Sequence, residues 1–129
     1  MTKILILGSE GFLGSVLTPY LLKNNRHFEI TGVDKCFFGI NNKRNKKFKF
    51  YKKDYNQLSK NFFQKFEIII DLVNISNDPA SELNKKFTYQ TNYKNKVKLY
   101  NKIKNLKNIS RYISMSSCSV YGNNKNIID

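Results

Sequence analysis

The sequence is short of several residue types, and each shortage excludes a class of protein. Its 129 residues include two cysteines and one histidine, too few for a disulfide framework or a zinc site built from those ligands. No apolar run approaches the ~20 residues of a membrane span. The run after Lys3 stops at Gly8, too early for the core of a signal peptide. These absences predict a cytoplasmic protein without a structural metal or membrane anchor.

Acidic residues are also scarce, since 9 Asp and Glu stand against 23 Lys and Arg, for a formal net charge of +14. Only three of the basic residues are arginines, whereas proteins that read nucleic-acid bases depend on arginine for bidentate contacts. Seven basic residues lie between Lys43 and Lys53, where we expect a solvated surface with weak, salt-sensitive affinity for nucleic acid. A basic nucleic-acid-binding protein is an alternative function, but no specific nucleic-acid partner is predicted.

Short apolar runs alternate with segments of helical periodicity. The segments expected as strands are 3–7, 28–33, 47–51, 68–70 and 111–116. The segments expected as helices are 13–24, 58–66 and 84–105. The apolar stripe of the first helix is expected at Leu13, Val16, Leu17, Tyr20 and Leu21, and that of the last at Phe87, Val97, Tyr100 and Ile103. This order predicts an α/β fold with a mainly parallel sheet, and the alternating lysines of 47–51 indicate a sheet edge.

A glycine-rich loop joins the first strand to the first helix, with the sequence Gly8-Ser9-Glu10-Gly11-Phe12-Leu13-Gly14. Glycines in this context permit a tight turn, let the backbone approach a pyrophosphate, and let helix and strand pack closely. Free N–H groups at the helix start then face the phosphate charge. The loop predicts a site for a dinucleotide cofactor.

The second strand ends at Asp34, twenty positions after Gly14. A carboxylate there accepts hydrogen bonds from the adenosine ribose of NAD and repels the additional phosphate of NADP. NAD is therefore the favoured cofactor. Nearby positive charges at Lys35, Lys43 and Arg44 soften that repulsion and keep NADP as the less favoured alternative.

Four features of the sequence belong together: the spacing of Gly8, Gly11 and Gly14, the segment 72–79, Asn92, and the segment 116–122. Together they resemble the glycine pattern, the fourth-strand segment, the helix asparagine and the strand-five signature of the extended short-chain dehydrogenase/reductase family. This family contains the NAD-dependent nucleotide-sugar epimerases and dehydratases. The resemblance covers essentially the whole chain. It implies a Rossmann-type doubly wound parallel sheet of strand order 3-2-1-4-5, truncated after strand 5.

The resemblance also implies roles for individual residues. The implied cofactor-binding residues are Gly8, Gly11, Phe12, Leu13, Gly14, Asp34, Asp54, Tyr55, Val73, Asn74 and Asn92. Among them the glycines would hold the pyrophosphate, Asp34 the ribose, and Asp54 the adenine, with Val73 and Asn74 on the nicotinamide side. Ser117 matches the catalytic Ser/Thr that hydrogen-bonds the reacting sugar hydroxyl. The structural alternative for Ser117 is a strand-end serine bonded to backbone.

Two departures from the family's pattern bear on the reaction. Cys118 and Ser119 stand where sugar dehydratases carry an acidic pair, which favours an epimerase or reductase because water elimination would lack its proton donor. Tyr121 and Lys125 have the spacing of the family's catalytic Tyr-x-x-x-Lys, but the intervening Gly-Asn-Asn is a poor helix former. The lysine and tyrosine would then not share one helix face, so this pair is not expected to be catalytic.

The sequence is therefore interpreted as one domain, residues 1–129, that forms the NAD-binding portion of a nucleotide-sugar epimerase. Its sugar-binding C-terminal portion is expected to be absent. The isolated chain is expected to be inactive, and to associate with itself or with a complementing C-terminal polypeptide because an apolar sheet edge is left open. A non-catalytic NAD-sensing module is the alternative within the same fold.

Overall fold

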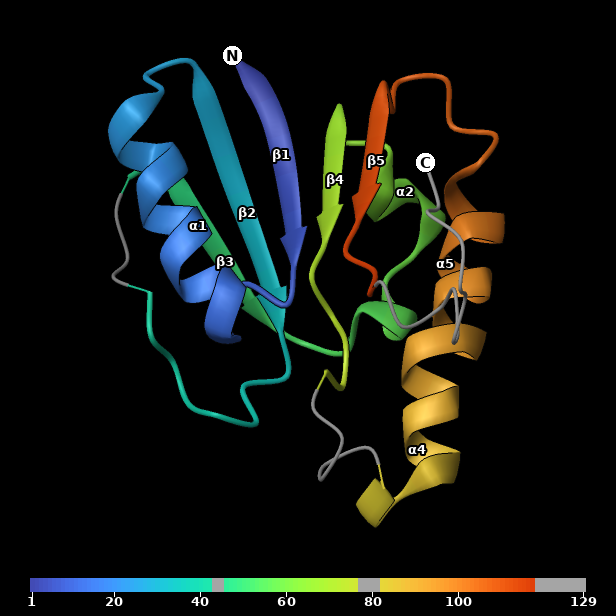
Figure 1. The fold of residues 1–129 in the computed structure, drawn as a ribbon. Helices are drawn as coiled ribbons and strands as arrows, with labels where there is room; N and C mark the ends of the chain where they lie inside the picture. Colours follow the sequence, from blue (N-terminus) through green and yellow to red (C-terminus); the bar gives the residue numbers. More distant parts are fainter. Residues whose placement is uncertain (43–45, 77–81, 118–129) are drawn as a thin grey trace, which may run out of the picture.

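A computed structural model describes residues 1–42, 46–76 and 82–117, which form a sheet with helices on both faces (Figure 1). The elements in chain order are β1 (Thr2–Leu7), α1 (Phe12–Asn24), β2 (Phe28–Asp34), β3 (Phe48–Lys52), η1 (Tyr55–Gln57), α2 (Lys60–Phe63), β4 (Ile68–Asp71), α4 (Lys85–Tyr89), η2 (Gln90–Lys94), α5 (Asn95–Ile103) and β5 (Arg111–Ser114). All neighbouring strands pair in parallel, in the order β3-β2-β1-β4-β5. The predicted fold class and strand order are confirmed.

The central strand β1 supplies both halves of the core because successive side chains point to opposite faces of a sheet. Ile4 and Ile6 belong to a cluster that also contains Ile30 and packs against α1. Leu5 and Leu7 belong to a second cluster on the face covered by α2 and α5, where Phe63, Leu99 and Ile103 pack. Each residue of this strand from Ile4 to Leu7 is at most 2% exposed.

The buried face of α1 differs from the expected stripe. Leu17 and Leu21 pack against the sheet as expected, but Val16 is 65% and Tyr20 63% exposed. The fully buried positions are Gly14 and Thr18. The helix is rotated so that Gly14 faces the glycine loop, and this close contact decides which side of the helix meets the sheet.

The long helix after β4 contains one π-helical turn, η2, between α4 and α5. The expected apolar face was wrong at Phe87, Val97 and Tyr100, which are 42%, 43% and 55% exposed. Ile103 enters the core as expected, together with Leu99 and, beyond the helix, Leu106. The extra residue of a π turn changes the phase of a helix, so a single regular pattern does not describe the buried face on both sides of η2.

The strand β3 lies at one edge of the sheet, as the alternating lysines predicted. Lys49 pairs with Glu29 of β2 at 2.6 Å, so part of the basic segment is neutralised by a neighbouring strand. The second expected helix, 58–66, is reduced to the four residues of α2, and the single turn η1 precedes it. In the part of the chain that the structure describes, no helix has the length and apolarity needed to cross a membrane.

Candidate cofactor site

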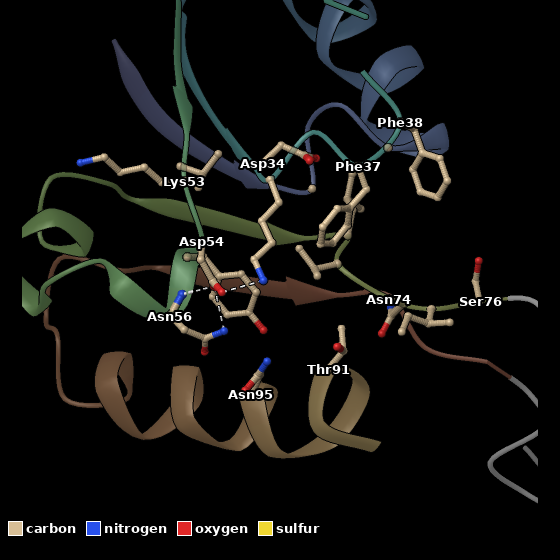
Figure 2. Close-up of a pocket in the computed structure, with 18 of the residues that line it drawn as sticks. Asp34, Phe37, Phe38, Lys53, Asp54, Asn56, Asn74, Ser76, Thr91 and Asn95 are labelled. Atoms are coloured by element: carbon tan, nitrogen blue, oxygen red, sulfur yellow. Dashed lines mark hydrogen bonds and ion pairs between the residues drawn. The ribbon is translucent and has the colours of Figure 1, made fainter. Parts of the chain in front are cut away.

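The carboxyl ends of the first four strands converge on one cavity of about 580 Å³. In open α/β sheets, ligands bind at this edge, where the chain leaves the strands in opposite directions. The lining residues are Gly8, Gly11, Val33, Asp34, Lys35, Phe37, Phe38, Lys53, Asp54, Tyr55, Asn56, Leu72, Val73, Asn74, Ile75, Ser76, Phe87, Thr91 and Asn95 (Figure 2).

The three glycines of the loop differ in whether the fold itself requires a residue without a side chain. Gly8 has φ +80°, a left-handed conformation that favours glycine. A Cβ on Gly14 would lie 2.2 Å from the Gly8 carbonyl oxygen, so a side chain cannot fit between helix and loop. A Cβ on Gly11 would meet only that same oxygen, at 3.4 Å. The protein itself therefore requires glycine at the first and third positions, while the second leaves open space at the cavity wall.

The first turn of α1 is open to an anion. Its N-cap is Gly11, which offers no side-chain hydrogen bond, and no acidic residue lies in the first turn. The first N–H groups of a helix have no partner within the helix, so those of Phe12 and Leu13 are available to a ligand. Their side chains are 88% and 47% exposed and do not line the cavity.

Asp34 is fixed by backbone donors on both sides. Its Oδ2 accepts from the Glu10 N–H at 2.9 Å and its Oδ1 accepts from the Cys36 N–H at 2.6 Å. These bonds connect the glycine loop to the loop after β2 and orient the carboxylate at the cavity wall. Cys36 is a free thiol, and burial together with the charge of Asp34 raises its pKa, which makes it a weak nucleophile.

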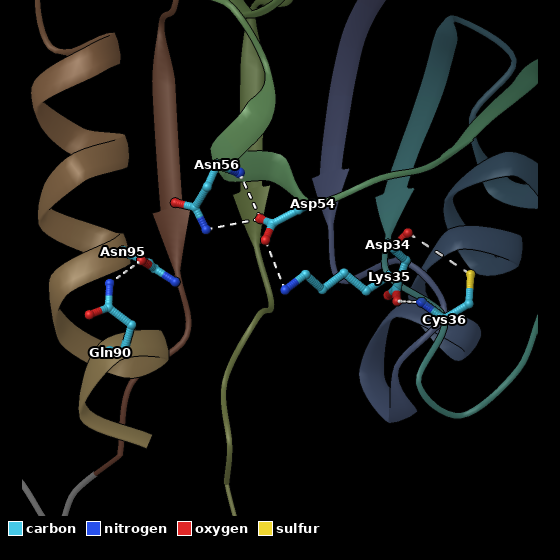
Figure 3. A network of polar contacts seen from close by, with 7 residues as sticks. All are labelled: Asp34, Lys35, Cys36, Asp54, Asn56, Gln90 and Asn95. Carbon is cyan, nitrogen blue, oxygen red and sulfur yellow. Dashed lines mark hydrogen bonds and ion pairs between the residues drawn. The ribbon is translucent and has the colours of Figure 1, made fainter. Parts of the chain in front are cut away.

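Asp54 lies across the cavity from Asp34 and is already engaged within the protein (Figure 3). Its Oδ2 pairs with Lys35 Nζ at 2.8 Å, and its Oδ1 accepts from the Asn56 N–H and Nδ2, each at 2.9 Å. Burial alone would raise the pKa of Asp54, but Lys35 and Asn56 outweigh it and hold the pKa below its ordinary value. The positive charge of Lys35 is thus directed to Asp54, and a ligand that contacts this carboxylate meets the lysine too.

Glu10 is a residue of the predicted glycine loop to which the sequence assigns no role, yet it is only 1% exposed. Its Oε2 accepts from the Asn41 N–H and, at 2.9 Å, from the Asn42 N–H, and its Oε1 accepts from Asn42 Nδ2 at 3.0 Å. The buried carboxylate therefore fastens the far end of the loop after β2 to the glycine loop. The sequence contains one indirect signal of this buried carboxylate: an acidic residue lies between two glycines, and a later loop carries the two adjacent asparagines Asn41 and Asn42.

A buried charge pair underlies the cavity. Asp71, at the end of β4, is fully buried, and its Oδ1 lies 2.7 Å from Lys96 Nζ of α5. Asp71 also accepts from the Tyr112 hydroxyl at 2.8 Å and from the Val73 N–H at 3.1 Å. The neighbouring Tyr55 is 6% exposed, and its hydroxyl has no hydrogen-bond partner among the described residues. Burial and the charge of Asp71 raise the pKa of the Tyr55 and Tyr112 phenols.

Two asparagines hold the segment after β4. Asn92, in the π turn, donates from Nδ2 to the Ile75 carbonyl at 2.8 Å and accepts from the Ile75 N–H at 2.9 Å. Asn74 donates from Nδ2 to the Met115 carbonyl at 3.1 Å, which ties the ends of β4 and β5 together. Ser117 is exposed three residues beyond β5 and is not part of the cavity wall.

The predicted residues divide into three groups. Those that line the cavity are Gly8, Gly11, Asp34, Asp54, Tyr55, Val73 and Asn74. Those that the structure describes but that do not line the cavity are Phe12, Leu13, Gly14, Asn92 and Ser117. Those outside the described residues are Lys43, Arg44, Cys118, Ser119, Tyr121 and Lys125. Within the described ranges, no group of three metal-ligating side chains occurs.

The parallel sheet with its glycine loop and edge cavity defines the Rossmann class of α/β proteins. Residues 4–129 match the NAD dependent epimerase/dehydratase family. The chain belongs to this family.

The similar proteins are much longer. A dTDP-D-glucose 4,6-dehydratase from Dictyostelium discoideum is 34% identical over 131 residues, which cover 93% of this chain and 30% of that protein. Among solved structures, the UDP-N-acetylglucosamine 4-epimerase of Methanobrevibacter ruminantium M1 has a TM-score of 0.83 at 24% identity and covers 98% of this chain and 41% of its own. The UDP-glucuronic acid 4-epimerase of Bacillus cereus, in complex with UDP-glucuronic acid and NAD, has a TM-score of 0.80 at 24% identity, with 99% and 44% covered. This chain spans less than half the length of each.

Proposed function

We propose that this chain binds NAD in the cavity at the carboxyl edge of its sheet, as the cofactor-binding portion of a nucleotide-sugar epimerase. The observation that carries the proposal is the space beside Gly11, where a Cβ would meet one atom at 3.4 Å. The uncapped start of α1 adjoins it. Together they fit a pyrophosphate, which needs close backbone approach and unpaired N–H groups.

The remaining predicted residues follow from that placement. With the pyrophosphate at Gly11, the adenosine ribose lies at Asp34, which backbone bonds hold in position. The nicotinamide side extends toward Val73 and Asn74. The negative charge of Asp34 favours NAD over NADP, because Lys35 is paired with Asp54 instead. Bound NAD would supply the redox chemistry of an epimerase, taking a hydride from a sugar carbon and returning it.

Ser117 is proposed to position the sugar hydroxyl in the complete enzyme. It follows β5, whose end is tied to Asn74 on the nicotinamide side through the Met115 carbonyl. A serine hydroxyl is a weak proton acceptor at neutral pH, and general base catalysis typically contributes a factor of 10² to 10⁴. We therefore expect no epimerisation of a nucleotide sugar by the 129-residue chain alone, monitored by chromatography of the sugar products. Turnover by the chain alone would contradict the assignment of Ser117 as an accessory residue.

The binding proposal is tested by thermal unfolding with and without NAD. A ligand that binds only the folded state stabilises it by about 2.7 kcal/mol at 100 times its Kd, so Tm should rise with NAD concentration. Gly11→Val should fold but lose this rise, because its side chain fills the space for the pyrophosphate. Val16→Leu, on the exposed side of the same helix, is the matched control and should keep it. A folded wild-type chain whose Tm is unchanged by millimolar NAD would refute NAD binding.

A non-catalytic NAD sensor shares the same cavity and predicts the same Tm rise. The two functions separate when a candidate C-terminal polypeptide is added. An epimerase portion should then convert a nucleotide sugar, whereas a sensor should bind NAD with no turnover in any mixture.

A further inference from the structure

The loop after β2 carries two exposed phenylalanines at the cavity. Phe37 is 70% and Phe38 86% exposed, and both line the cavity wall. Figure 2 shows the two rings next to each other, close to Asp34. A large exposed aromatic side chain gains nothing from the core, so neighbouring rings at a cavity indicate a surface for a ligand.

This loop is fixed at both ends. At its start the Cys36 N–H bonds to Asp34, and Cys36 itself adopts φ 61°, a left-handed conformation rare for a residue with a side chain. At its far end, five hydrogen bonds join Asn41 and Asn42 to the Ser9–Glu10 segment. Backbone strain of this kind persists where surrounding bonds impose it, often at binding sites. The rings are therefore presented from a loop whose ordering cost has been met in folding.

The ring of Phe37 has a further contact that sets its place. Lys35 Nζ lies 5.5 Å from the ring centroid and also pairs with Asp54. With the ribose at Asp34, the base attached to that ribose lies at this end of the cavity, away from Asn74. It meets an aromatic face on the loop after β2 and, on the loop after β3, the Asp54 carboxylate that pairs with Lys35.

Resting on the proposed function, we propose that Phe37 is a stacking platform for the adenine base of the dinucleotide, and that the buried carboxylate of Glu10 positions it. Every base offers a π face to an aromatic ring, and loss of one such stack weakens binding by about 5- to 150-fold. Glu10 lies on the glycine loop, so the pyrophosphate site and the stacking ring are held by one connection.

The first test uses Phe37→Leu and measures Kd by calorimetry for NAD, ADP-ribose and nicotinamide mononucleotide. We expect NAD and ADP-ribose to bind at least 5-fold more weakly and the mononucleotide, which has no adenine, to be unaffected. Tyr20→Leu removes an equally exposed ring outside the cavity and should change nothing. If wild type binds NAD and Phe37→Leu binds it equally well, the platform is refuted and the proposed function stands. If wild type fails to bind NAD, the proposed function itself fails.

A second test uses the absence of tryptophan from the sequence. Phe37→Trp introduces a single fluorophore, whose emission should be quenched by ADP-ribose and AMP but not by nicotinamide mononucleotide. Tyr20→Trp should respond to none of them. Equal quenching of the Phe37→Trp protein by the mononucleotide would place the wrong end of the dinucleotide at this ring and overturn the proposal.

The role of Glu10 is tested by a double-mutant cycle. Glu10→Gln keeps the size of the side chain but removes a charged acceptor, and should weaken ADP-ribose binding through displacement of the ring. Added to Phe37→Leu, it should cause little further loss, because both changes remove the same stack. Asn42→Ala, which removes two of the five hydrogen bonds, replaces Glu10→Gln if that variant does not fold. If the fold-losses in ADP-ribose affinity of the two single variants multiply in the double variant, the positioning role of Glu10 is refuted.

Discussion

Lys96→Met tests how strongly the buried charge pair supports the fold. Asp71 is fully buried, and the Lys96 side chain is 14% exposed, so neither charge is well solvated. Breaking such a pair from one side costs about 3–5 kcal/mol, because the remaining charge is left buried and uncompensated. Asp71 keeps the Tyr112 hydroxyl and the Val73 N–H as donors, which places the expected loss at the lower end, about 3 kcal/mol.

The loss should appear as a fall in the urea midpoint with an unchanged m-value, and as a fall in Tm of about 10 °C for a chain of this length. Lys98→Met, two positions along the same helix and exposed, is the control and should stay within about 0.5 kcal/mol of wild type. Lys96→Met combined with Asp71→Asn should recover most of the stability, since no lone charge remains. Equal stability of Lys96→Met and wild type, or a double variant as unstable as the sum of its singles, would refute the reasoning.

Four further outcomes are expected. Gly14→Ala should unfold the chain or lower its Tm strongly, because its Cβ would overlap the Gly8 carbonyl oxygen, whereas Gly11→Ala should leave circular dichroism and Tm nearly unchanged. Because the pKa of Asp54 is lowered in the folded chain, its ionised carboxylate stabilises the fold above the unfolded pKa of about 3.9, and this stabilisation is lost as the pH falls. Lys35→Met should raise the pKa of Asp54, which NMR titration measures. The pKa values of the buried Tyr55 and Tyr112 phenols are raised, so their contribution to folding stability is present below about pH 10, the unfolded pKa, and is lost as the pH rises above it. Ultraviolet titration should therefore show two tyrosines that ionise late, together with unfolding. DNA binding should vanish by ~0.2 M salt.

The sheet could be predicted from sequence because its signals are local. The run Ile4 to Leu7 ends at a glycine, and the run at Ile68 is fully apolar, so strand positions follow from composition and punctuation. The glycine spacing and Asp34 then place the ends of the first two strands at one ligand edge, and the family resemblance implies the strand order. Seven of the residues named from motifs do line one cavity.

The buried charges of Lys96, Asp71 and Glu10 could not be recognised in the same way. Lys96 lies on a helix with many lysines, and its place three residues before Leu99 and seven before Ile103 puts it on their face. Its partner Asp71 is distant in sequence and closes an apolar strand. Glu10 has its donors in a loop after a different strand. A charge is buried only when partners from other elements meet it, and such meetings have no periodicity within one segment.

The position of β1 has a consequence for how the chain is made. Ile4 pairs with Ile30 on one side and with Ile68 on the other, so the first strand to leave the ribosome must wait for β4 before both of its neighbours exist. Until β4 has been synthesised, Leu5 and Leu7 have no complete core to enter. Parallel pairings of this range close large loops and fold slowly, and an apolar strand that waits is a site of aggregation. Expression at low temperature, which weakens the association of exposed apolar surface, should therefore favour recovery of the folded chain.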